Sequence, residues 1–199
     1  MVSRETLLES YFQEKGAEIS RYAQMLGTIG IERGLIGPKE GDRIWDRHIA
    51  NCIPVTTLIP QGASVVDIGS GAGLPGIVIA LARPDTHLTL VEPLQRRVDF
   101  LNEVVLDIDL SSQITVVRGK AEGFRGSFDV VTSRAVAPLP KLLPMVRHLI
   151  KSGGSLLAIK GESAQAEIDA TPLNKQKALL HEIQLPDFDL ARVIEVQKA

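Results

Sequence analysis

The sequence predicts an α/β fold in which a mostly parallel sheet of seven strands follows a helical N-terminal segment. From residue 64 onward, short and almost wholly apolar runs rich in β-branched residues alternate with helical segments. This pattern is typical of a parallel sheet that helices cover on both faces. Before residue 63, apolar residues recur only at helical spacing. A glycine-rich turn separates the first predicted strand from the helix that follows it.

Residues 1–60 are expected to form a helical cap, and residues 61–199 a single compact domain. Apolar residues follow helical spacing over 7–12 and 19–29, and the breakers Gly34, Gly37 and Pro38 come next. A third helical stretch is expected over 41–53, ending near Pro54. A length of 199 residues, at roughly 150 per domain, fits one domain with an appendage.

The sheet of the second part can be assigned run by run. Its first five strands are expected at 64–68, 87–91, 114–117, 128–132 and 155–159. Helices are expected at 76–82, 95–106 and 139–150, with Ser152, Gly153 and Gly154 as the stop signal of the last one. A polar helix around 162–180 and a final hairpin of strands at 181–185 and 191–196 complete the prediction.

Composition limits the class of protein. The chain is 44% hydrophobic and 23% charged, close to globular averages, which excludes a wholly disordered chain. A single cysteine, Cys52, excludes an intrachain disulfide, and we expect it to be a small buried apolar residue. No apolar run approaches the length of a membrane span, and the N-terminus lacks the apolar core of a signal peptide, so we expect a cytoplasmic protein. The net charge of −2 argues weakly against nucleic-acid binding, although residues 61–160 carry 11 Lys and Arg against 9 Asp and Glu.

The most informative segment is the glycine loop 69–76, read GSGAGLPG, which follows Asp67-Ile68 at the end of the first strand. Glycines allow a sharp turn and a close approach of a ligand to the main chain. Ligands of open parallel sheets bind at the carboxyl ends of the strands. Glu92 ends the second strand some twenty residues later, where a carboxylate can accept hydrogen bonds from both hydroxyls of a ribose. Together these features predict a cofactor that contains adenosine.

Two cofactors fit this loop. Gly71, Gly73 and Gly76 match the dinucleotide fingerprint G-x-G-x-x-G, which on its own is a weak signal. Asp67 favours S-adenosylmethionine, because a carboxylate beside the glycines would repel a pyrophosphate but attract a sulfonium and an ammonium group. A nicotinamide-dependent oxidoreductase and a non-catalytic nucleotide-binding module remain the alternatives.

Four segments, the glycine loop among them, resemble one protein family. Asp67–Gly76 (DIGSGAGLPG), 82–84 (ARP), 128–140 (FDVVTSRAVAPLP) and 159–161 (IKG) look like the bacterial ribosomal RNA small subunit methyltransferase G family, also called glucose-inhibited division protein B. Residues 45–49 (WDRHI) resemble the W-x-R-H segment of that family, although 33–37 (RGLIG) stand where many members have Asn-Leu-Thr. The resemblance spans roughly residues 20–162.

The resemblance implies a class I, Rossmann-like S-adenosylmethionine-dependent methyltransferase with a helical cap. It would methylate N7 of a guanine, number 527 in the 530 loop of 16S ribosomal RNA, with the RNA or the 30S subunit as partner. It would need no metal and no membrane, and we expect a monomer. The predicted cofactor-binding residues are Asp67, Gly69, Gly71, Gly73, Leu74, Glu92, Ala121, Glu122 and Arg134.

The predicted catalytic residues are Arg134, Arg47 and His48. Arg134 follows the fourth strand, where its guanidinium could bind a carboxylate or a phosphate through paired N–H groups. Arg47 and His48 are expected to face the cleft from the cap, beside Trp45 as a packing anchor. Guanine N7 carries a lone pair and no proton, so its methylation requires alignment rather than a base. The sequence agrees, since it has neither an Asn/Asp-Pro-Pro-aromatic motif nor a Pro-Cys nucleophile.

Overall fold

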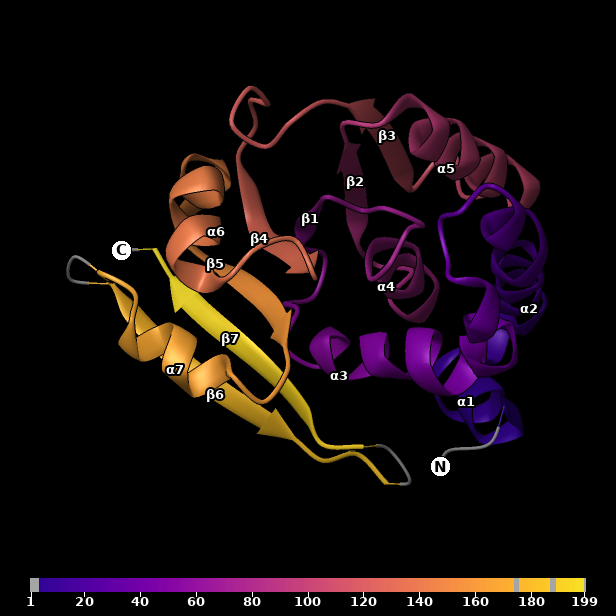
Figure 1. The fold of residues 1–199 in the computed structure, drawn as a ribbon, viewed down its shortest axis with the longest axis horizontal. Coiled ribbons are helices and arrows are strands. Elements are labelled where there is room, and N and C mark those ends of the chain that lie inside the picture. The colour runs from indigo at the N-terminus through magenta and orange to yellow at the C-terminus, as the bar shows by residue number, and fades with distance from the viewer. Residues whose placement is uncertain (1–3, 174–175, 187–188, 199) are drawn as a thin grey trace.

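The computed structural model describes residues 4–173, 176–186 and 189–198. Its centre is a seven-stranded sheet with the strand order β3-β2-β1-β4-β5-β7-β6 (Figure 1). The strands are β1 (Ser64–Ile68), β2 (His87–Glu92), β3 (Ile114–Arg118), β4 (Phe128–Arg134), β5 (Ile150–Lys160), β6 (Lys177–Ile183) and β7 (Ala191–Gln197). All neighbours pair in parallel except β5 with β7 and β6 with β7, which are antiparallel. The predicted fold, a mostly parallel sheet of seven strands with a C-terminal hairpin, is confirmed.

The strand order reverses between β1 and β4, which are neighbours in the sheet although two strands separate them in sequence. In doubly wound sheets, ligands bind beside such a switch point at the carboxyl ends of the strands. Here these ends carry the glycine loop after β1, Glu92 at the end of β2 and Arg134 at the end of β4. The topology therefore brings three of the predicted site segments to one edge.

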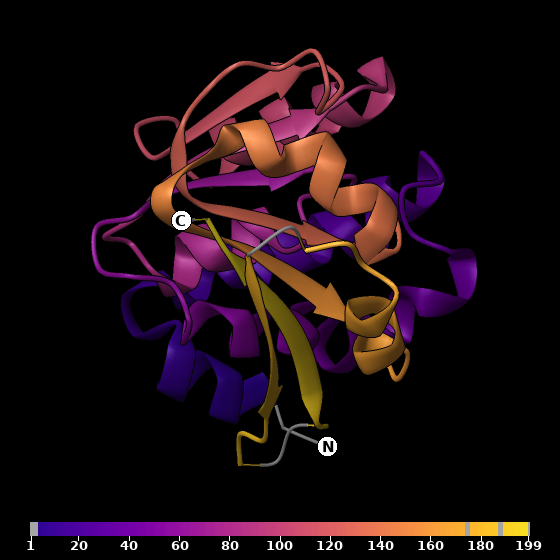
Figure 2. The same cartoon turned by 90° about the vertical axis from the view of Figure 1, so that its left-hand side faces the viewer.

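Helices cover both faces of the sheet. One core contains α4 (Gly76–Ala82), α5 (Gln95–Asp107) and the helical N-terminal segment, packed against side chains such as Val65, Leu88 and Leu90. The other core contains α6 (Leu139–Val146) and α7 (Ala164–Asp169) against Val66, Ile68 and other residues of the opposite face. Figure 2 shows α6 and α7 in front of the sheet and the N-terminal helices behind it.

The N-terminal segment is helical in short pieces. It contains α1 (Arg4–Tyr11), α2 (Gly16–Met25) and α3 (Ile53–Thr56), with further turns at Gln13–Lys15, Leu26–Gly30, Pro38–Arg43, Ile44–Ile49 and Ala50–Cys52. The helical stretch predicted over 41–53 therefore begins earlier, at Pro38, and continues through Pro54. Pro54 has no N–H, but it lies in the first turn of α3, where a backbone N–H has no partner within the helix. Within the described residues, no helix has the length and apolar character that crossing a membrane requires.

Two of the predicted boundaries are wrong. The glycines read as the stop of a helix over 139–150 lie inside β5, because α6 ends at Val146 and a 3-10 turn follows over Arg147–Leu149. Gly153 donates its N–H to the carbonyl of Lys198, and Gly154 accepts from the N–H of Lys198, so the end of the chain pairs with them as in a sheet. A Cβ on Gly154 would lie 2.7 Å from the carbonyl oxygen of Asp129, so this close strand approach requires glycine.

The second correction concerns the polar helix predicted around 162–180. Of the described residues in this span, only Ala164–Asp169 form an α-helix, and Pro172 follows shortly afterwards. β6 then begins at Lys177, four residues before the predicted strand. The side chains of β6 alternate between solvent and the core, as successive side chains of a strand do. Leu179 is exposed to solvent, whereas Ala178 and Leu180 pack against the core.

Candidate active site

The glycine loop turns through three residues with positive φ. Gly69, Gly71 and Gly73 have φ values of +69°, +59° and +98°, which side chains rarely adopt. A Cβ on Gly69 would collide with Val136, and one on Gly73 with Ile77. A Cβ on Gly71 would meet nothing closer than the Gly69 carbonyl oxygen at 3.8 Å. Among the three, Gly71 alone presents an open face, which a ligand could approach.

Asp67 lies beneath this loop and is completely buried. Its Oδ2 accepts a hydrogen bond from the N–H of Gly76 at 3.0 Å, whereas its Oδ1 has no partner among the described residues. Burial raises the pKa of Asp67 to about 7, although the Gly76 N–H and the charge of Arg134 act to lower it. A buried carboxylate oxygen without a donor is costly unless a cationic or hydrogen-bonding group meets it.

Glu92 holds the glycine loop from the end of β2. Its Oε2 accepts from the N–H of Gly71 and its Oε1 from the N–H of Leu94, both at 3.0 Å, and Arg97 approaches to 3.6 Å. The side chain is 1% exposed, so the structure shows a loop-fixing role that the sequence did not predict. Each carboxylate oxygen can accept a second hydrogen bond, so ribose recognition by Glu92 remains a prediction.

The remaining cofactor positions divide between buried and exposed residues. Leu74 and Ala121 are buried, with the side chain of Leu74 in the core that joins the N-terminal segment to the sheet. Glu122 is exposed in the turn after β3. Contact of these three residues with a cofactor stays a prediction.

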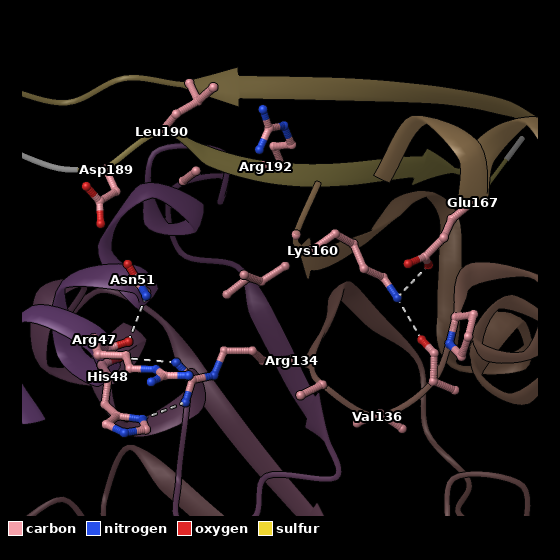
Figure 3. A pocket seen from close by; sticks show the side chains of 16 residues that line it. Arg47, His48, Asn51, Arg134, Val136, Lys160, Glu167, Asp189, Leu190 and Arg192 are labelled. Atoms are coloured by element: carbon pink, nitrogen blue, oxygen red, sulfur yellow. Dashed lines mark hydrogen bonds and ion pairs between the residues drawn. The ribbon is translucent and has the colours of Figure 1, made fainter. Parts of the chain in front are cut away.

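A pocket of about 810 Å³ opens beside these residues at the same edge of the sheet (Figure 3). Arg47, His48 and Asn51 line it from the N-terminal segment, and the chain from Arg134 to Pro138 lines it from the end of β4. The opposite wall is formed by the end of β5, by Glu167 of α7 and by residues 189–192. The three predicted catalytic residues therefore meet in one pocket, which the glycine loop itself does not line.

Arg134 connects the pocket with the cofactor loop. Its Nη1 approaches the carbonyl of His48 at 3.4 Å and the Cys52 sulfur at 3.7 Å, and its Nη2 approaches Nδ1 of His48 at 3.3 Å. None of the ion pairs among the described residues includes Arg134. Its positive charge nevertheless lowers the pKa of Asp67. Arg134 is thus a half-buried guanidinium between Asp67 and the pocket, available to an anionic ligand.

The segment after β4 is fixed by the ion pair between Lys160 and Glu167. Ala135 has a φ of +57°, an unfavourable conformation for a residue with a Cβ. Lys160 donates to the carbonyl of Ala137 at 2.6 Å and pairs with Glu167 at 2.8 Å. Glu167 also accepts from the N–H of Leu139 at 2.7 Å. Lys160 therefore holds the pocket wall.

The comparisons with known proteins decide the family. The sequence model of the family described as rRNA small subunit methyltransferase G (GidB) matches residues 15–192. The chain belongs to this family. The glycine loop, the end of β4 and the pocket all lie within the matched part of the chain.

Relatives in the family are similar over most of this chain. Proteins called ribosomal RNA small subunit methyltransferase G from Kineococcus radiotolerans and Thermobifida fusca are 52% and 54% identical over 161 and 151 residues. These alignments cover 80% and 75% of this chain, and the chain spans 63% of the length of each relative. The Acidothermus cellulolyticus relative is 53% identical over 76% of this chain and 68% of its own length.

Solved structures agree on the fold. A precorrin-6y C5,15-methyltransferase from Geobacter metallireducens superposes with a TM-score of 0.57 at 14% identity, covering 83% of this chain and 91% of that one. A ribosomal protein L11 methylase from Lactobacillus delbrueckii gives 0.58 at 13% identity, covering 75% and 77%. The fold is the class I, Rossmann-like methyltransferase fold.

The structure adds site residues that sequence analysis of the family segments missed. Helical spacing predicts Tyr22 only as an apolar position of a cap helix, yet its hydroxyl donates to the carbonyl of Ala72 at 2.8 Å. Burial raises the pKa of Tyr22 well above its ordinary value, so the hydroxyl keeps the proton that it donates. Glu40 and Asn51 were not singled out either, and both contact Arg47. The only available signal for Tyr22 was a polar-tipped aromatic residue at a core position, since buried Tyr hydroxyls usually find a partner.

Tyr22→Phe is expected to weaken binding of S-adenosylhomocysteine about two- to tenfold. The phenyl ring fills the same space, but the Ala72 carbonyl loses its donor, and a neutral hydrogen bond contributes about 0.5–1.5 kcal/mol. Isothermal titration calorimetry measures the effect. Tyr11→Phe serves as the matched control, because Tyr11 is only partly buried and lies at the end of α1. Equal affinities of Tyr22→Phe and wild type would show that the N-terminal segment does not support the loop.

Proposed function

We propose that this chain transfers the methyl group of S-adenosylmethionine to 16S ribosomal RNA, at N7 of guanine 527. Membership of the family supports the coarser part, a methyltransferase that acts on small-subunit ribosomal RNA. The N7 position and the nucleotide rest on the resemblance described above. The relevant compartment is then the cytoplasm, where 30S subunits are present.

One observation carries the proposal most directly. Arg134, which forms no ion pair with a carboxylate of the described residues, lines a pocket of about 810 Å³ next to a glycine loop at the switch point of the sheet. This volume lies within the roughly 300–1,000 Å³ of small-molecule sites. The unpartnered Oδ1 of Asp67 and the open face of Gly71 suit a cofactor with cationic groups and an adenosyl moiety, which Asp67, Glu92 and the loop would hold. Bound there, S-adenosylmethionine supplies an electrophilic methyl group.

The residues of the pocket fit a reaction without a protein nucleophile. Cys52 is fully buried, and burial raises its pKa to about 11, so it is a thiol at neutral pH. A thiolate attack of the kind that pyrimidine carbon-5 methylation uses is therefore not supported here. Guanine N7 needs neither a nucleophile nor a base, and the work of the protein is to align it with the methyl group.

Transfer of tritium from labelled S-adenosylmethionine to 30S subunits, followed by mass mapping of the 16S ribosomal RNA, tests the proposal. The subunits are prepared from cells that lack this protein, so that the target base is unmethylated. We expect one methyl group per subunit, on the guanine of the 530 loop, and none on subunits already methylated. Label on another base or a different ring atom would contradict the assignment.

Calorimetry tests one alternative function and tritium transfer tests the other. A nicotinamide oxidoreductase would bind NAD, whereas the proposed methyltransferase should bind S-adenosylhomocysteine and show no heat with NAD. A non-catalytic module would bind the nucleoside but transfer no tritium. Family membership favours the methyltransferase over both alternatives.

Asp67→Asn is expected to gain stability relative to wild type as the pH rises from about 4 to about 8. The folded protein retains a proton on Asp67 up to about pH 7, whereas the unfolded chain releases it near pH 3.8. Wild type therefore loses stability as the pH rises through this window, because the folded state binds more protons than the unfolded state. Asparagine cannot titrate, and each 1 kcal/mol of difference corresponds to about 2–4 °C in Tm.

Thermal denaturation of the ligand-free protein at several pH values measures this difference. Asp85→Asn is the control, because Arg83 holds the pKa of Asp85 below its usual range and its contribution is nearly constant above about pH 5. Asp85→Asn should therefore show a nearly constant loss above about pH 5. Tm curves of Asp67→Asn and wild type that run parallel would show that Asp67 is ionised throughout.

A further inference from the structure

Glu40 contacts two neighbouring residues of the pocket at once. Its Oε1 lies 3.1 Å from Nη1 of Arg47, and its Oε2 lies 3.1 Å from Nε2 of His48. Glu40 lies in the Pro38–Arg43 turn, and the two partners lie in the Ile44–Ile49 turn. A carboxylate that accepts hydrogen bonds from two adjacent side chains restricts the rotamers of both.

The other nitrogen of His48 fixes the tautomer. Nδ1 lies 3.3 Å from Nη2 of Arg134, and a guanidinium can only donate, so Nδ1 must accept. The ring proton then sits on Nε2, where it is donated to Glu40. The three side chains form one directed chain, in which Arg134 donates to His48 and His48 donates to Glu40.

The charges around His48 favour the neutral ring. Burial and the charges of Arg134 and Arg47 lower its pKa below the ordinary value, and only Glu40 raises it. The other ionisable groups that line the pocket are Lys160, Glu167, Asp189 and Arg192. Lys160 and Glu167 neutralise each other, and Arg192 pairs with Glu182. A protonated His48 would place a donor against Arg134 and break the contact.

We propose that Glu40 is a positioning residue, which holds the His48 ring so that its Nδ1 orients the guanidinium of Arg134 toward the pocket. The inference deepens the proposed methyl transfer and rests on it. Glu40 contacts neither Arg134 nor the glycine loop, so it acts through His48. Figure 3 shows those members of the hydrogen-bonded chain that line the pocket: a dashed line joins His48 and Arg134, and Arg47 lies beside them.

The test compares Glu40→Ala and Glu40→Gln with wild type. Alanine removes the acceptor, and we expect methyl transfer to 30S subunits to fall at least about fivefold. Glutamine keeps an acceptor for the His48 ring and should restore transfer to within about twofold of wild type. Because the charge of Glu40 raises the pKa of His48, the acid limb of the pH–rate profile should move to lower pH in Glu40→Gln.

Two controls separate positioning from stability. Glu103→Gln removes one partner of an exposed ion pair with Arg33, and it should change neither the rate nor the profile. The ¹⁵N shifts of the His48 imidazole report the tautomer and its titration without any need for activity, and the chain has only four histidines. We expect the Nε2–H form in wild type and a lower pKa in Glu40→Gln.

A Glu40→Ala variant with unchanged transfer, or one whose only change is a lower Tm, would overturn the inference. An Nδ1–H tautomer of His48 in wild type would overturn it as well. If wild type itself transfers no methyl group, the proposed function fails, and the positioning of His48 is then judged from the imidazole titration alone.

Discussion

Gly71→Val is expected to reduce the affinity for S-adenosylhomocysteine at least about 100-fold. Gly71 has a φ of +59°, where a β-branched residue is strained, and its N–H donates to Glu92. An added Cβ at Gly71 would meet nothing closer than the Gly69 carbonyl oxygen at 3.8 Å, so the space next to this position is open. The valine side chain would occupy the face that the proposed cofactor approaches. Calorimetry with S-adenosylhomocysteine measures the loss.

Gly62→Val is a closely matched control for this variant. Gly62 has a φ of +67°, has nothing within 4 Å of an added Cβ, and donates its N–H to the carboxylate of Asp85. The strain of about 1–3 kcal/mol should be similar at both positions. Only Gly71→Val should lose binding, while both variants should lose several degrees of Tm. Equal affinity in the two variants would contradict the assignment of the cofactor loop.

The elements nearest the site were the most predictable from sequence. β1 and α4 have the predicted bounds, because an apolar run, a glycine cluster and a second apolar run leave one local solution. β2 and β4 extend the predictions by one and two residues, which makes Glu92 and Arg134 the last residues of their strands. Residues at the ends of parallel strands share one edge, so this part of the site followed from the strand assignment.

The errors arose where distant contacts decide the local structure. Gly153 and Gly154 have the local signature of a helix stop, but their pairing with the end of the chain places them in β5. Local periodicity cannot show a partner some forty-five residues away. The helix predicted to 180 fails for the same reason, since pairing with β7 determines the structure of 177–183.

The missed site residues depend on hydrogen bonds between elements. Tyr22 reaches Ala72 across 50 positions, and Arg134 reaches His48 across 86. No spacing rule connects such pairs, so only the family segment at 45–49 predicts a role for His48. Glu40 lies eight residues before His48, outside any helical i, i+4 pairing, and its role became visible only with the geometry of both imidazole nitrogens.

Arg134→Lys is expected to reduce methyl transfer to 30S subunits at least about tenfold, with little change in Tm. A tenfold loss corresponds to about 1.4 kcal/mol in the barrier. The guanidinium meets the His48 carbonyl with one nitrogen and the His48 ring with another, while its remaining N–H groups are available to a ligand. The ammonium group of lysine is a compact point charge without the planar arrangement of donors of a guanidinium, so it cannot keep both contacts with His48.

The sign of this effect follows from the charges of the reaction. In the proposed reaction the methyl group leaves a sulfonium, and a methylated N7 is itself cationic, so a fixed cation near the transfer path is unfavourable unless an anion neutralises it. No carboxylate of the described residues pairs with Arg134. Burial raises the pKa of Asp67 to about 7 in the ligand-free protein, so Asp67 is only partly ionised there at neutral pH. We therefore expect the neutralising anion to be the carboxylate of the donor or a phosphate of the substrate, and either one can accept paired N–H groups from arginine. Lysine keeps the charge but binds this anion less specifically.

Arg21→Lys provides the control, because Arg21 makes a two-point contact with Asp107 on an exposed surface away from the pocket. That variant should transfer methyl groups at the wild-type rate. If Arg134→Lys also transfers at the wild-type rate, paired recognition by Arg134 is wrong and its charge alone suffices. If Arg134→Lys unfolds instead, the contacts with His48 and Cys52 are structural. A reduced rate in a protein with wild-type Tm leaves recognition of an anion at the transfer site as the role of Arg134.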